Sequence, residues 1–344
     1  MTQPSLSRRR FVAIASAAFA AGCGGHERFV LPAPQGERTA LRAPRWNVRP
    51  GPVLTLGAPG AWDGADVLNP SVLFHQGIYY NFYSGYDGKT WHTGLATSPD
   101  GIGWRRQGKI LSPDPASWEG DYIAANGAAL ARDGEFLYWY QGNRLPAIGL
   151  ARSQTGRSWT KHSGPVLRPG PRGSWDERGV ADPYVIRAGD FYYMYFLGQD
   201  RARRQRLGLA RSLDGVRWRK LLSNPILELG EPGAFDENGL GEPAVWAWQG
   251  RYWMAYTGRD RREYRRIGLA WSEDGVRWRR LPPETVFEGR ESWNSKVVCD
   301  PSVLVEGGRI RVWFGGGDVA TPAENLNGQI GYATLESADA NLSE

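Results

Sequence analysis

The sequence predicts an all-β protein, a five-bladed β-propeller, and three observations support this prediction. Short runs of aromatic and β-branched residues, broken by Gly, Pro, Asn and Asp, fill the chain, which is typical of strands joined by turns. One segment recurs roughly every 58 residues, and a period of this length indicates stacked or radial units. One repeat is split between the two ends of the chain, as expected for a closed ring.

Each repeat opens with a polar residue, continues through an aromatic run and then reaches a segment such as Ile-Gly-Leu-Ala. Four of the five opening residues stand before a Pro, which is tolerated at the first residue of a strand. We call these five residues the blade heads: Asn69, Asn126, Asp182, Glu242 and Asp300.

A turn motif defines the second half of each blade. Ser-x-Asp-Gly-x-x-Trp ends at Trp104, Trp218 and Trp278, and a variant ends at Trp159. Asp-Gly favours a tight hairpin, since type I′ turns need positive φ at both central positions. The Trp then opens a fourth strand, so each repeat holds four antiparallel strands, as in a propeller blade.

The fifth repeat lacks its fourth strand before the C-terminal tail of residues 337–344. Residues 46–56 resemble the segment that begins at Trp159, and we expect them to supply that strand and close the ring. Closure removes exposed sheet edges, which would otherwise pair with other chains. The propeller is therefore predicted to span residues 46–336 as one domain.

The first 22 residues are expected to be an export signal. Twin arginines, Arg8 and Arg9, precede a short apolar stretch, and residues 21–23 resemble a lipoprotein cleavage box that ends in Cys23. Lipidation is therefore expected at Cys23, and the protein is expected in the periplasm or cell envelope. Residues 23–45 would then form a flexible tether rich in Pro, Arg and Gly.

Composition argues against several other functions. The two cysteines, Cys23 and Cys299, make no disulfide framework, and the four scattered histidines give no metal-ligand spacing, so no metal or cofactor is expected. Without Arg8, Arg9 and Arg10 the formal charge falls from +6 to +3, too little to argue for a nucleic-acid partner. The protein is expected to be a monomer that meets a membrane only through its lipid anchor.

Propeller geometry brings the blade heads to one rim of the ring, where carboxylates and aromatic rings suit glycosidic cleavage. Glu242 stands between Asp182 and Asp300 on adjacent inner strands, and like charges held close raise at least one pKa. The middle carboxyl, Glu242, is expected to keep its proton longest and act as general acid, with Asp182 or Asp300 as base or nucleophile.

Residues on the same rim are candidates for substrate binding. For several of them the alternative is an architectural role, because Asn before Pro often forms a local turn and the recurrent Trp residues can pack between blades. The candidates are Asn69, Asn126, Asp66, Trp175, Arg178, Asn238, Arg259 and Trp293.

Two arginine-rich loops accompany these candidates, at residues 201–206 and 259–266. They are either a basic rim that balances the acids or a site for an anion such as a uronate, a sulfated sugar or phosphate, which the planar guanidinium binds in a bidentate manner.

The blade heads with Asp-Pro or Glu-Pro, the Tyr-Tyr-Met-Tyr strand and the Gly-Leu-Ala-x-Ser-x-Asp-Gly-x-x-Trp motif resemble the five-bladed propeller glycosidases of families 43, 32 and 130. The resemblance covers residues 46 to 336. Families 43 and 32 place Asp, Asp and Glu on three successive blades, whereas here Glu242 falls between two aspartates.

The resemblance and the acids imply an exported glycoside hydrolase that acts on an oligo- or polysaccharide. Two alternatives stay open. A non-catalytic propeller could bind glycans or an envelope protein, as Asn at two blade heads would suit. A phosphorylase like those of family 130 could use the arginine loops for phosphate.

Overall fold

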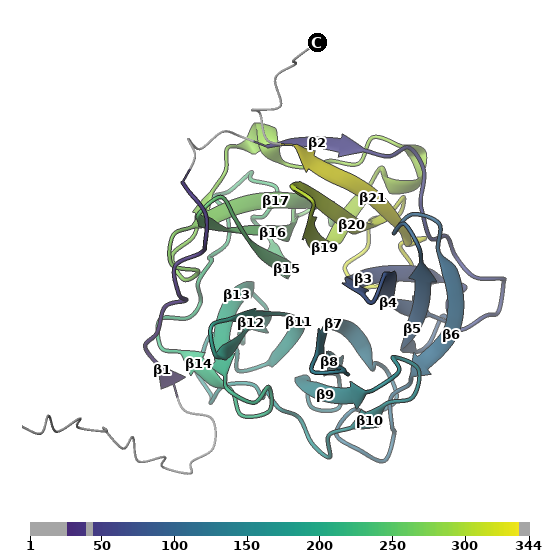
Figure 1. Cartoon of the computed structure of the whole chain (residues 1–344), viewed down its shortest axis with the longest axis horizontal. Coiled ribbons are helices and arrows are strands. Elements are labelled where there is room, and N and C mark those ends of the chain that lie inside the picture. Colours follow the sequence, from purple (N-terminus) through teal and green to yellow (C-terminus); the bar gives the residue numbers. More distant parts are fainter. Residues whose placement is uncertain (1–25, 39–43, 337–344) are drawn as a thin grey trace, which may run out of the picture.

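The computed structural model describes residues 26–38 and 44–336 (Figure 1). The described residues are all-β: they form strands and two short 3-10 helices, η1 Pro283–Thr285 and η2 Ser292–Asn294. Within these ranges no helix is long and apolar enough to cross a membrane. The predicted export signal, the lipidation site Cys23 and the C-terminal tail 337–344 lie outside the described residues.

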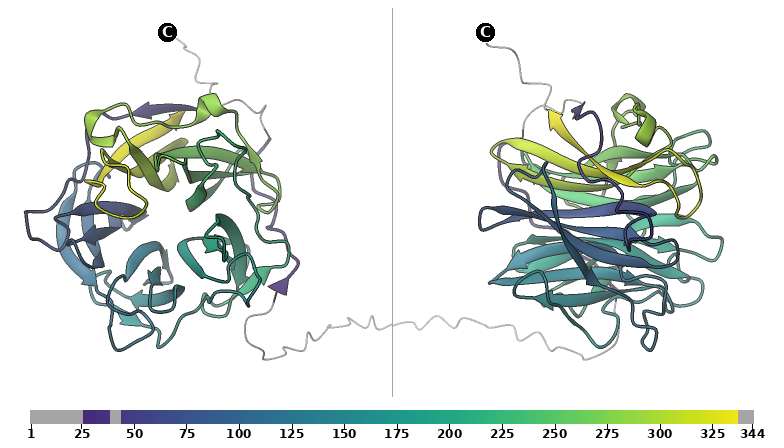
Figure 2. Two further views of the ribbon diagram at one scale, coloured as in Figure 1. Left: turned by 180° about the vertical axis from the view of Figure 1, so that it is seen from behind. Right: turned by 90° about the vertical axis from the view of Figure 1, so that its right-hand side faces the viewer.

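The strands form five four-stranded antiparallel units, and the first strand of each unit lies nearest the centre of Figure 1. Figure 2 shows the same circular order from behind. Units 4 and 5 are joined by one parallel residue pair between β17 and β19.

Each unit consists of four strands. Unit 1 holds β3 Asp66–His75, β4 Ile78–Tyr86, β5 Trp91–Ser98 and β6 Arg105–Leu111. Unit 2 holds β7 Ala125–Arg132, β8 Glu135–Gly142, β9 Ala147–Ser153 and β10 Thr160–Lys161. Unit 3 holds β11 Gly179–Ala188, β12 Phe191–Gln199, β13 Gln205–Ser212 and β14 Arg219–Leu221. Unit 4 holds β15 Gly239–Trp248, β16 Arg251–Arg259, β17 Arg265–Ser272 and β18 Arg279–Arg280. Unit 5 holds β19 Val297–Glu306, β20 Arg309–Gly317, β21 Gln329–Glu336 and β2 Arg45–Val48.

The N-terminal segment completes unit 5. β2 pairs antiparallel with β21, and Leu54 forms a further antiparallel bridge to Ile330. The ring of Trp46 stacks on Phe287, and its indole N–H donates a hydrogen bond to the carbonyl of Thr285 at 2.9 Å. These contacts fasten the strand that the sequence predicts for residues 46–56.

The hydrophobic core lies between neighbouring units. One buried cluster joins Leu73 and Phe82 of unit 1 to Phe136 of unit 2, and another joins Trp313 of unit 5 to Val67 of unit 1. The first and last units of the chain are therefore packed against each other.

An aromatic ring ahead of each unit explains two glycines that recur in its second and third strands. In unit 3, a Cβ on Gly198 would lie 2.3 Å from the ring of Trp175, and one on Gly208 would lie 2.4 Å from it. No side chain fits in that space, so only glycine lets the ring lie against the sheet. The same arrangement recurs for Trp62, Trp118, Phe235 and Trp293.

An acid follows four of these five rings, and each of these acids is buried and neutralised within its own unit; Asn294 follows Trp293. Asp176 forms a hydrogen-bonded ion pair with Lys220, and Glu119 pairs with Lys161 at 2.6 Å. Asp63 and Asp236 pair in the same way with Arg106 and Arg280. These acids connect the inner rim of a unit to its outer strand.

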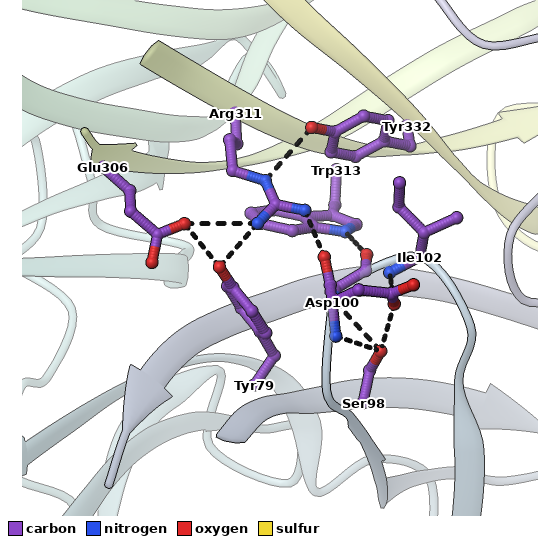
Figure 3. Close-up of polar contacts among 9 residues, drawn as sticks. Tyr79, Ser98, Asp100, Ile102, Glu306, Arg311, Trp313 and Tyr332 are labelled. Carbon is purple, nitrogen blue, oxygen red and sulfur yellow. Dashed lines mark hydrogen bonds and ion pairs between the residues drawn. The ribbon is translucent and has the colours of Figure 1, made fainter. Parts of the chain in front are cut away.

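The Asp-Gly hairpins connect neighbouring units. In unit 1, Asp100 accepts hydrogen bonds from Ser98 and from the backbone N–H of Ile102 (Figure 3). It also accepts one from the backbone N–H of Gly103. The indole N–H of Trp313 in unit 5 donates to the Gly101 carbonyl at 2.7 Å, and Arg311 donates to the Asp100 carbonyl. Trp139 and Tyr195 bind the hairpins of units 3 and 4 equivalently.

Residues 26–38 depart from the expected flexible tether. β1 His26–Glu27 pairs parallel with β14, and Glu27 forms an ion pair with Arg211. Leu31 is buried, and its N–H donates to the carbonyl of Asp274 at 2.9 Å. The segment is therefore packed across units 3 and 4, because Leu31 fills the space above the Gly275 hairpin.

Candidate functional site

The five blade heads occupy the same backbone position in the five units. Each lies where the register between the first and second strands shifts, which marks a β-bulge. Each also has a positive φ, between 43° and 53°. This conformation is uncommon for residues other than glycine and clusters at functional sites.

Hydrogen bonds between units fix these strained residues. The N–H of Asn69 donates to Asp300 Oδ2 at 3.1 Å, and the N–H of Asp300 donates to Thr257 Oγ1 at 3.1 Å. The N–H of Asn126 donates to Ser84 Oγ at 3.0 Å. Each bond reaches the preceding unit, so the circular packing of the units orients the heads.

All five heads line one cavity of about 260 Å³ at the centre of the molecule. Tyr122, Gln141, Gln205 and Arg259 line it too, and part of its wall is formed by Pro322, Ala323, Glu324 and Leu326. A cavity with a few convergent polar groups is the usual form of a small-molecule site. No group of three or more His, Cys, Asp or Glu in the described residues is arranged to hold a metal ion.

The cavity perturbs two of its carboxyl groups strongly. Burial, followed by the charges of Glu242 and Asp300, raises the pKa of Asp182 well above its usual value. Asp182 keeps some surface open to the cavity but lies deep among protein atoms. Burial and the charge of Glu242 also raise the pKa of Asp300 to about 7, although the thiol of Cys299 and Arg265 favour its ionised form. Both aspartates are therefore able to hold a proton near neutral pH.

Glu242 has a different environment. The charges of Arg259 and Arg265 attract its carboxylate electrostatically. Its Oε2 is buried and has no hydrogen-bond partner within the described part of the chain. One oxygen of Glu242 therefore stays available to a ligand.

A loop of unit 5, residues 318–328, covers one side of the cavity. Asp66 holds this loop: its carboxylate accepts the backbone N–H groups of Asn325, Leu326 and Gly328 at 2.7 to 2.9 Å. Arg265 donates to the carbonyl of Ala323 at 2.9 Å. The predicted substrate-binding role of Asp66 is corrected here, because its side chain is fully buried and occupied by the loop.

Four other predicted substrate-binding residues lie away from this cavity. Trp175 and Trp293 pack against the glycines of their own units, as the architectural alternative expects. Asn238 donates to Glu263 Oε1 at 3.4 Å, and Arg178 lines a separate pocket on the surface. The structure therefore places none of these four residues at the central cavity, and Trp175 and Trp293 have the packing role. The cavity brings together Asn69, Asn126, Arg259 and the three candidate catalytic residues.

Most arginines of the two loops neutralise acids. Arg204 and Arg206 pair with Asp200 at 2.7 and 2.9 Å, and Arg262 and Arg266 pair with Asp260 at 3.3 and 3.4 Å. The balancing role considered for these loops therefore holds for these four residues.

Several cavity residues were not among the predicted site residues. Tyr122 donates to Glu324 Oε1 at 2.6 Å, and Gln205 accepts from Arg259 at 2.9 Å. Arg265 belongs to one of the two arginine-rich loops of the sequence, but its position at the cavity depends on the loop of unit 5, residues 318–328, to which it donates a hydrogen bond. No repeat signal marks Tyr122 or Glu324, because both lie in segments that occur in one unit.

Known proteins with this fold include glycoside hydrolases. The family model described as the glycosyl hydrolases family 32 N-terminal domain matches residues 69–227. Two uncharacterized proteins from strains of Mycobacterium tuberculosis are 26% identical over 231 residues, which is 62% of this chain and 75% of theirs.

Solved structures resemble most of the chain. A glycoside hydrolase superposes with a TM-score of 0.69 at 17% identity, over 87% of this chain and 96% of its own. A structure described with glycoside hydrolases of the GH130 family of mannoside phosphorylases, which target beta-1,2 mannosidic linkages in Candida mannan, gives 0.68 at 18% identity over 92% and 99%. A GH32 beta-fructofuranosidase from Bombyx mori gives 0.61 at 19% identity over 83% and 62%. The chain therefore has the all-β fold of these propeller glycosidases, and the resemblance expected from its sequence is confirmed.

Proposed function

We propose that this protein cleaves glycosidic bonds in the central cavity. The observation that supports this proposal is the division of three carboxyl groups on adjacent units into two kinds. Asp182 and Asp300 have raised pKa values, whereas Glu242 interacts with the charges of both Arg259 and Arg265 and has one buried oxygen without a hydrogen-bond partner among the described residues. Titratable groups whose environments differ in this way are typical of acid and base pairs in enzymes.

The roles proposed here differ from those expected from the sequence. Asp182 is the better general acid, since burial and both neighbouring charges favour its protonated form. It would give its proton to the glycosidic oxygen as the bond to the anomeric carbon breaks, so the leaving group departs as an alcohol. Glu242, which interacts with the charges of Arg259 and Arg265, would attack the anomeric carbon or take a proton from the attacking water.

Kinetics of three variants test these roles on natural oligosaccharides and on aryl glycosides with an activated leaving group. Asp182→Asn should lower activity on the natural substrate by roughly 10²–10⁴-fold and largely spare the activated one, which needs little protonation. Glu242→Ala should lower both, and added azide should restore turnover of the activated substrate if Glu242 is the nucleophile. Glu231→Gln, an exposed carboxylate outside the cavity, should leave both rates unchanged.

Equal losses on both substrates in Asp182→Asn would contradict the assignment of the acid to this residue. Formation of a sugar 1-phosphate on addition of phosphate would favour the phosphorylase alternative.

The second candidate function is glycan binding without catalysis. Amide side chains at two of the five heads, Asn69 and Asn126, favour it, because they can bind sugar hydroxyls but cannot transfer protons. Oligosaccharide binding without turnover of any glycoside by the unmodified protein would support this function.

We further propose that the five units are the blades of a propeller closed by β2, over residues 46–336. Export through residues 1–22 and a lipid anchor at Cys23 stay proposals, as do the monomeric state and the location in the cell envelope. The basic start and short apolar stretch of the sequence support export and the envelope location.

A further inference from the structure

A second pocket lies on the surface beside unit 3. It is open, with a volume of about 340 Å³, and is lined by Arg172, Glu177, Arg178 and Arg201. The segment before β11 supplies the first three residues, and the loop between β12 and β13 supplies Arg201. Three guanidinium groups thus share one small pocket with a single carboxylate.

The positive charge of this pocket is not balanced by the protein. Arg172, Arg178 and Arg201 are exposed, and no side-chain hydrogen bond or ion pair is recorded for them among the described residues. Glu177 accepts the backbone N–H of Gly173 at 2.6 Å, which fixes its position in the loop. Bringing three unpaired like charges together costs free energy unless an anion joins them.

Unit 4 provides an internal comparison, because its loops have the same design. Glu237 accepts the N–H of Gly233 at 2.9 Å, as Glu177 does with Gly173, but Glu237 also pairs with Arg261 at 3.2 Å. The positions that correspond to Arg172 and Arg178 hold Pro232 and Asn238. Unit 3 therefore carries two additional cations, and its equivalent of Arg261 is left without an acid.

We propose that this pocket of unit 3 binds an oxyanion substituent of a glycan, a sulfate ester or a uronate carboxylate. Arginine suits both groups, because its planar fork donates two parallel hydrogen bonds to neighbouring oxygens. This inference rests on the proposed function of the central cavity.

The location of the pocket relates it to the candidate active site. β11 begins at Gly179, next to Arg178, and reaches Asp182 three residues later, about 10 Å along the strand. An extended glycan with one sugar in the cavity could therefore place a charged substituent of another sugar among these arginines. The pocket would select anionic polysaccharides while the cavity performs the chemistry.

Binding measurements on a catalytically disabled protein test this proposal. The background is Asp182→Asn with Glu242→Gln, and the probes are sulfated dextran oligosaccharides, oligogalacturonates and neutral dextran oligosaccharides of equal length. The test variant adds Arg172→Ser, Arg178→Asn and Arg201→Ser. The matched control adds Ser at three exposed arginines beside the Asp-Gly hairpins, Arg105, Arg217 and Arg219.

The test variant should bind at least one anionic probe tenfold or more weakly than the background protein, and the control variant should bind it with unchanged affinity. Loss for the sulfated probe alone assigns the pocket to sulfate esters, and loss for oligogalacturonate alone assigns it to uronates. Rising salt should weaken anionic binding and leave neutral binding unchanged.

Equal losses in the test and control variants would overturn the proposal, since they would show only general attraction to a basic protein. Equal affinity of the background protein for neutral and anionic probes would overturn it too. Because binding is measured without turnover, failure here leaves the kinetic test of Asp182 and Glu242 unaffected, and failure of that test leaves this one valid.

Discussion

Replacement of Asp300 by Asn should stabilise the protein in alkaline solution and change its stability little in acid. Burial and the charge of Glu242 raise the pKa of Asp300 from 3.8 to about 7 in the folded protein. The folded state therefore binds the proton more tightly than the unfolded state does. The resulting stabilisation is complete below pH 3.8 and is lost as pH rises through about 7.

The size of this stability difference follows from the difference between the two pKa values of Asp300, 3.8 when unfolded and about 7 when folded. At about 1.4 kcal/mol for each pH unit, the stabilisation lost between 3.8 and about 7 amounts to roughly 4 kcal/mol. Asn cannot ionise, and its Oδ1 can still accept the hydrogen bonds from Asn69 and Cys299. Asp300→Asn should therefore exceed the unmodified protein in stability by up to roughly 4 kcal/mol near pH 8.5, and by only a small fraction of this near pH 4.

Urea unfolding of both proteins at these two pH values measures the difference directly, provided that the m-values agree. Asp182 should respond as well, since Asp300 contributes to its raised pKa. A stability difference that is the same at both pH values would refute the reasoning, because it would show that Asp300 does not change its protonation on unfolding.

Three further predictions concern the fold and its export. Deletion of residues 46–56 should cause aggregation or a large loss of thermal stability, since β21 loses its pairing with β2; an unchanged melting temperature would contradict ring closure. Gly198→Ala should destabilise the protein by roughly 1–3 kcal/mol or more in a denaturation assay, because the new Cβ would lie 2.3 Å from the ring of Trp175. The control Gly164→Ala should destabilise it far less, because the space around Gly164 is open. Replacement of Arg8 and Arg9 by Lys should retain the protein in the cytoplasm if these arginines form a twin-arginine signal, and cell fractionation measures this.

The sequence by itself determined the repeating architecture. The period of the heads, the aromatic runs and the Asp-Gly hairpins are local patterns, and each is copied in several units, so chance resemblance is small. The same period identified Asp182, Glu242 and Asp300 and the strand at residues 46–56. These predictions hold because strand and turn preferences act over a few neighbouring residues.

The tertiary structure decided what each polar residue does. Asp66 and Asp300 are both acids at the start of an inner strand, yet one holds a loop by three backbone N–H groups and the other faces the cavity. The repeat places Glu242 between two aspartates, but it does not show that the charges of Arg259 and Arg265 also act on this carboxylate. A pKa depends on burial and on charges from distant segments, and neither can be read from the repeat.

Arg201 and Arg261 differ in their ion pairing, and this difference too was decided by the tertiary structure. Both arginines occupy equivalent positions in the repeat, but only Arg261 reaches an acid. Ion pairing depends on distances of a few ångströms between side chains of separate loops, whereas the repeat in the sequence fixes only which loops meet.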